Sequence, residues 1–73
     1  MPERPVITLG GVDPFEWTVK VYRSSITGLF HAVVVVASWH AVGQEYVIKE
    51  DAKLEGCSMM ANMTAELEDL IDA

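Results

Sequence analysis

The chain has 73 residues, of which 51% are hydrophobic and 22% charged, and its formal net charge is −6. This balance is typical of a folded domain and excludes a disordered chain. Its five basic residues are not clustered, which argues against duplex nucleic acid as a partner, because phosphate neutralisation provides most of that affinity. The length predicts a single domain, 1–73, near the size at which burial only just offsets chain entropy.

The first strand is expected close to the amino terminus. The β-prone run 6–9 is closed by a glycine pair, so 1–14 is predicted to form an arm or an edge strand. Apolar and polar residues then alternate from Phe15 to Arg23. This period of two is typical of a strand and places every second residue from Phe15 to Val21 on one face.

The segment 29–39 follows turn residues at 24–28 and contains four consecutive valines. Because β-branched residues favour strands, we expect a central strand here, paired antiparallel to the previous one. Both of its faces are apolar. The second face is expected to include Leu29, Val33, Val35 and Trp39. After Gly43, the segment 44–49 is predicted to be the third main strand, at an edge, because of its charged and polar content.

The period changes after Asp51, where apolar residues recur at steps of three and four, as on one stripe of an amphipathic helix. The stripe consists of Cys57, Met60, Met63, Leu67, Leu70 and Ile71. Gly56 costs about 1 kcal/mol relative to alanine in a helix. We therefore expect the helix to begin between Asp51 and Ser58.

These elements predict an α+β fold. A three- or four-stranded antiparallel meander over 15–50 carries an acidic carboxy-terminal amphipathic helix, 51–73, on one face. One helix covers one face of the sheet, whereas large exposed apolar patches usually mark interaction sites. A homodimer is therefore expected, with the amino-terminal arm or a different partner as the other candidates for covering the second face.

No arrangement of residues predicts catalysis. His31, His40 and Cys57 lack the paired spacing of zinc ligands, and no nucleophile elbow surrounds Ser38. The glycine pair at 10–11 lacks the lysine and the following helix of a phosphate-binding loop. We expect no catalytic residue, metal or cofactor, and an enzyme ranks third among the functional hypotheses.

The charge is concentrated at the carboxyl end. Segment 1–44 has three acids and three bases, whereas 45–73 has eight acids against two lysines. Four acids occupy the last helical turns, where the helix dipole disfavours negative charge and no base lies within reach. They indicate either a solvated face that keeps the protein soluble or a surface that docks on a basic partner. The docking set is Glu66, Glu68, Asp69, Asp72, Glu55 and Asp51.

The functional expectation is a non-enzymatic acidic protein-binding module. Its most concrete form is a small phage or mobile-element inhibitor, similar to anti-CRISPR proteins, that blocks a basic nucleic-acid-binding surface of a host protein complex. The alternative is an antitoxin-like or phage-assembly subunit that oligomerises through its apolar sheet face.

The expected location is the cytoplasm, or the host cytoplasm for a phage protein. A single cysteine, Cys57, cannot form an internal disulfide, which favours a reducing compartment. No apolar run resembles a signal peptide, and the longest apolar stretch, 32–37, is too short to span a bilayer. We therefore expect no membrane partner.

Overall fold

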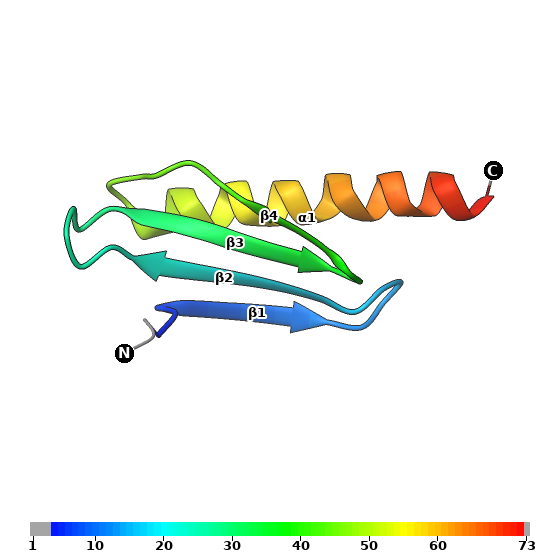
Figure 1. The fold of residues 1–73 in the computed structure, drawn as a ribbon, viewed down its shortest axis with the longest axis horizontal. Coiled ribbons are helices and arrows are strands. Elements are labelled where there is room, and N and C mark those ends of the chain that lie inside the picture. Colours follow the sequence, from blue (N-terminus) through cyan, green and yellow to red (C-terminus); the bar gives the residue numbers. More distant parts are fainter. Residues whose placement is uncertain (1–3, 73) are drawn as a thin grey trace.

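The computed structural model describes residues 4–72 and shows a four-stranded sheet followed by one helix (Figure 1). The elements are β1 (Ile7–Gly11), β2 (Trp17–Arg23), β3 (Phe30–Val36), β4 (Trp39–Val42) and α1 (Lys49–Asp72). The strands are antiparallel, in the order β1-β2-β3-β4, and α1 packs against β2 and β3. The α+β prediction is confirmed, and the segment around 6–9 forms an edge strand.

The core lies between α1 and the two central strands. In the register of β2 and β3, Val19 is opposite Val34 and Val21 is opposite Ala32, and all four side chains are buried. The alternating pattern of β2 therefore predicted its buried face correctly. Among the described residues, the largest fully buried side chains are valines: Val19, Val21, Val34 and Val36.

A tight hairpin interrupts the segment that was predicted as one strand over 29–39. Ala37 and Ser38 form the turn, with Ala37 at a φ of 54° and its N–H donating to the Glu16 carbonyl at 2.8 Å. Trp39 begins β4 directly opposite Val36. Opposed residues in an antiparallel pair share a face, so Trp39 lies on the helix side of the sheet. Its predicted place beside Val33 and Val35 is wrong.

The predicted strand over 44–49 is also wrong. The strand beside β3 at that edge of the sheet is β4, and Tyr46 makes only an isolated bridge with Phe30, through two backbone hydrogen bonds of 2.7 Å. The helix begins at Lys49, two residues before the predicted range. Glu50 and Asp51 lie in its first turn, where the helix dipole favours negative charge.

Small residues let α1 approach the sheet closely. Ala52 and Gly56 are buried against it, and a Cβ at Gly56 would lie 2.7 Å from Cγ1 of Val19 and 2.9 Å from Cβ of Ala32. Glycine is therefore needed at position 56 because no side chain fits between the helix and the sheet there, and it does not mark a weak first turn of the helix. Cys57, predicted on the packed stripe, is only partly buried.

From Met59 onward, α1 packs through larger side chains and then extends beyond the end of the sheet. Met59, Met60, Met63 and Leu67 pack against the cluster of Val19, Val34 and Val36. A 24-residue helix extends about 36 Å and a seven-residue strand only about 23 Å, so the last turns project beyond the strands (Figure 1). Leu70 and Ile71 are consequently 63% and 67% exposed, contrary to their predicted place in the core.

Replacing Gly56 by alanine tests the close approach. Alanine gains about 1 kcal/mol in an unhindered helix, but here the added methyl group overlaps buried atoms of neighbouring strands, and such overpacking costs about 1 to 3 kcal/mol. We expect Gly56→Ala to lower the free energy of unfolding by about 1 kcal/mol, measured by urea denaturation.

Ser58→Ala is the matched control, because Ser58 is exposed on the same helix. It should leave stability unchanged or raise it slightly, since alanine has the higher helix propensity. A Gly56→Ala protein as stable as the Ser58→Ala protein would contradict the close approach.

Candidate partner-binding surfaces

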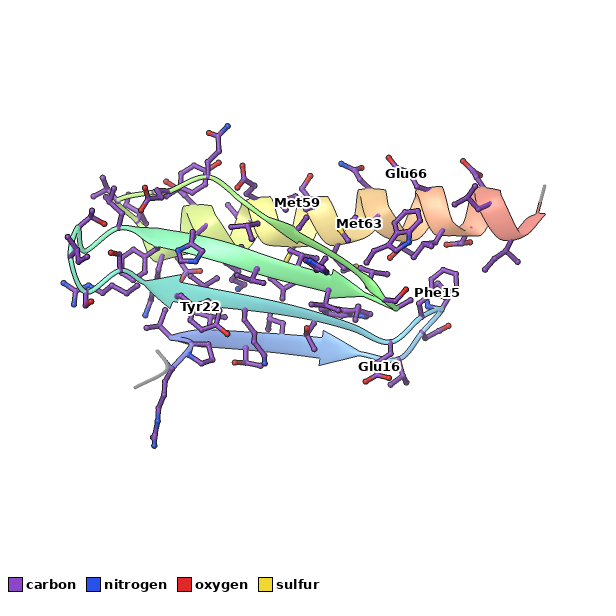
Figure 2. The ribbon with its side chains drawn as sticks, in the orientation of Figure 1. Phe15, Glu16, Tyr22, Met59, Met63 and Glu66 are labelled. Carbon is purple, nitrogen blue, oxygen red and sulfur yellow. The ribbon has the colours of Figure 1, made fainter. Side chains whose placement is uncertain are left out.

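The projecting helix end, residues 66–72, combines acids with exposed apolar side chains. Glu66, Glu68 and Asp69 are exposed, and Glu66 extends outward from α1 in Figure 2. The one salt bridge among the described residues joins Lys53 and Glu50, 3.8 Å apart in the first turns of the helix. The three acids therefore have no cationic neighbour within the described chain. Asp72 is the last helical residue, and its side chain lies outside the described part.

The apolar stripe of α1 continues into this end without anything to cover it. Met59 and Met63 lie along the part of α1 that runs beside the strands, and Phe15 lies at the end of the sheet (Figure 2). Leu70 and Ile71 follow Leu67 at steps of three and four, so they extend the same stripe past the last strand residues. The projecting helix end is thus amphipathic, with acids beside an exposed apolar pair.

Glu55 differs from the other acids in the predicted docking set, because it is engaged within the chain. One carboxylate oxygen accepts a hydrogen bond from the Gln44 N–H at 2.7 Å and the other accepts one from the Tyr46 hydroxyl at 2.8 Å. The same side chain occupies the space that a Cβ at Gly43 would need. We call this arrangement the Glu55 clasp; it ties the segment between β4 and α1 to the helix.

Asp51 is separated from the projecting helix end. It is exposed in the first turn of α1, and the 15 residues to Glu66 correspond to about 22 Å along the axis. The predicted docking acids therefore do not form one surface. Glu66, Glu68 and Asp69 are brought together, Asp51 lies near the opposite end of the helix, and Glu55 is held in the clasp.

The sheet surface opposite α1 is a second candidate, which we call the open face. Val33 and Val35 lie on it as predicted, next to Lys20 and Thr18 of β2. Val42 of β4, which is 64% exposed, lies opposite Val33 and was not predicted for this surface. Leu29 precedes β3 and is partly buried. The alternating pattern identified the valines of β3, but Val42 depended on the unexpected hairpin.

The open face also carries both histidines. His31 stacks on Tyr22 with ring centroids 5.8 Å apart, and His40 lies opposite Val35. Within residues 4–72 no group of three His, Cys, Asp or Glu side chains is placed to hold a metal ion, and no pocket is formed.

The Glu55 clasp is expected to lose its contribution to the stability of the fold at alkaline pH. The hydrogen bond that the Tyr46 hydroxyl donates to the Glu55 carboxylate raises the pKa of Tyr46 above its ordinary value. The partial burial of Tyr46 and the negative charges of Glu55 and Asp51 raise it further. The folded state then holds the proton of the Tyr46 hydroxyl more tightly than the unfolded chain, in which tyrosine titrates at about pH 10. The stabilisation is complete below that pH and is lost as pH rises through the raised pKa.

We therefore expect the Tyr46→Phe protein to be less stable than the wild type at pH 8. The difference in stability between the two proteins, measured by thermal denaturation, should narrow only as the pH rises above about 10. Tyr22→Phe is the control, because Tyr22 lies on the open face and not in the clasp. Its stability should decline with pH as in the wild type. A constant gap between Tyr46→Phe and the wild type would contradict the coupling.

Comparison of the chain with protein-family models, curated proteins and solved structures found no match. Within the described residues, α1 is the only helix, and it is too polar to cross a membrane.

Proposed function

We propose that the protein is a non-enzymatic binding module that docks its projecting helix end into an apolar groove bordered by basic residues on another protein. The observation that carries this proposal is the exposure of Leu70 and Ile71, at 63% and 67%, beside acids that have no cationic neighbour in the described chain. Helix-in-groove recognition uses apolar anchors at steps of three and four. Leu67, Leu70 and Ile71 have this spacing.

The position of the acids supports docking over a purely structural role. Carboxylates near a helix carboxyl terminus destabilise the helix by a few tenths of a kcal/mol each, because the dipole is negative there. The acids of the first turn, by contrast, lie where the dipole favours them. A basic partner would offset the unfavourable field at the projecting helix end and accelerate association.

In its most concrete form, the module is a small phage or mobile-element inhibitor, similar to anti-CRISPR proteins, that covers a nucleic-acid-binding surface of a host complex. Such surfaces are basic, and the inhibitor would act in the cytoplasm, that of the host for a phage protein. A structural or regulatory subunit is the second candidate, which the exposed valine of β4 on the open face favours.

The docking proposal is tested by removing charge at one end of the helix only. The wild-type protein, immobilised, captures its partner from host lysate, and association is then measured with the purified partner. Glu66→Gln, Glu68→Gln and Asp69→Asn together should slow association about tenfold while stability stays level or rises. Leu70→Ser with Ile71→Ser should accelerate dissociation. Added DNA should compete with the wild-type protein.

The matched control removes three acids elsewhere, through Glu45→Gln, Glu50→Gln and Asp51→Asn. These residues are exposed and lie before or in the first turn of α1, so the net charge changes equally. The control should associate almost as fast as the wild type. Equal effects of the two triple variants would show that net charge, and not the projecting helix end, governs binding.

A further inference from the structure

We infer that the open face of the sheet is the contact surface of a homodimer in which two copies stack face to face. This interface is separate from the projecting helix end and does not depend on the proposed docking. Its centre is formed by Val33, Val35 and Val42, whose neighbours across the strands are Lys20, Thr18 and His40. The occupant is a second copy of this chain, for three reasons.

The first reason is the small core of a single copy. Among the described residues, no fully buried side chain is larger than valine, and the remaining buried apolar residues are two alanines. A domain of this size gains little stability from such a core and usually needs a further source of burial. The valines of the open face are the apolar side chains that a second sheet would bury.

The second reason is the amount of uncovered surface. The chain exposes 5024 Å², whereas a compact monomer of 8.1 kDa exposes about 4,500 Å². Its radius of gyration of 12.8 Å also exceeds the value of about 11 Å expected for 73 residues. Part of this excess belongs to the projecting helix end, where Leu70 and Ile71 are exposed. On the open face, Val42 is 64% exposed, and Val33 and Val35 are partly exposed.

The third reason is the distribution of charge. Among the strand residues on the open face, Lys20 alone carries a full charge, whereas the acids of α1 belong to the opposite layer. Two sheets stack about 10 Å apart, and a helix adds about 10 Å on each outer side. The two acidic helices would then lie about 30 Å apart, well beyond the screening length of about 8 Å. Contact through the helices would bring the acids of both copies together, whereas the stacked open faces would bring together only the two Lys20 side chains.

The amino-terminal arm does not take this place in the described part of the chain. The Val6 N–H donates to the Val21 carbonyl at 2.7 Å, so the arm continues the edge pairing of β1 with β2 and does not cross the open face. Residues 1–3 lie outside the described part. A dimer stacked in this way would present two projecting helix ends on its outer surfaces, which would favour bivalent binding.

Sedimentation between 1 and 100 µM tests the interface. The wild type should approach a dimer, Val35→Glu should be monomeric, and Val35→Thr should weaken dimerisation at least tenfold. Threonine retains the branched shape that strands favour, so this variant stays informative if the glutamate variant does not fold. Val47→Glu, at an exposed valine outside the sheet, is the control and should remain dimeric. A wild type that stays monomeric at 100 µM would overturn the proposal.

A distance measurement tests the orientation. Spin labels at Ser58→Cys, in a Cys57→Ala background, lie on the exposed side of α1. Stacked sheets predict a distance between the two labels of at least about 30 Å, because two sheets separate the helices. A distance below about 20 Å would show that the copies meet through their helices, and the face-to-face arrangement would be wrong.

Discussion

The close contact between α1 and the two central strands is the constraint on which the rest of the structure depends. Gly56 lies over Val19 and Ala32 with no room for a Cβ, so the first half of the helix lies directly on the sheet. The Glu55 clasp, one residue before Gly56, fixes the segment that leads into the helix. From this anchored start, the methionines and Leu67 continue the packing toward the far end of the strands.

Two exposed surfaces follow from this arrangement. Because α1 is anchored near its beginning and is longer than any strand, its end projects past the sheet and exposes Leu70 and Ile71. Because there is only one helix in the described chain, the opposite side of the sheet remains open. One surface is acidic and the other nearly uncharged. They lie on different layers, so a basic partner and a second copy would not compete for the same site.

The acids of the carboxy-terminal half have different roles according to their position on α1. Glu50 and Asp51 suit the field of the helix amino terminus, and Glu55 accepts two hydrogen bonds from the preceding segment. Glu66, Glu68 and Asp69, in contrast, make no salt bridge within the described residues. Sequence spacing predicted an acidic helix correctly but gave equal weight to Glu55 and Glu66, because a hydrogen bond to a residue 11 positions away leaves no periodic pattern.

The sequence by itself determined the class of each long element. Side chains repeat every two residues along a strand and every 3.6 residues along a helix, so local geometry leaves a pattern in the sequence. This pattern predicted β2 from its alternation and α1 from the helical spacing after Asp51, and β-branched valines predicted β3. Only the tertiary structure decided the hairpin at Ala37 and Ser38, which has no asparagine or glycine to announce it, and hence the face that Trp39 occupies. It also decided that Gly56 is a packing residue and that Leu70 is exposed. The first depends on the distance between the helix and the sheet, and the second on how much of the helix lies over the sheet. Both are set by contacts between elements that are far apart in the chain.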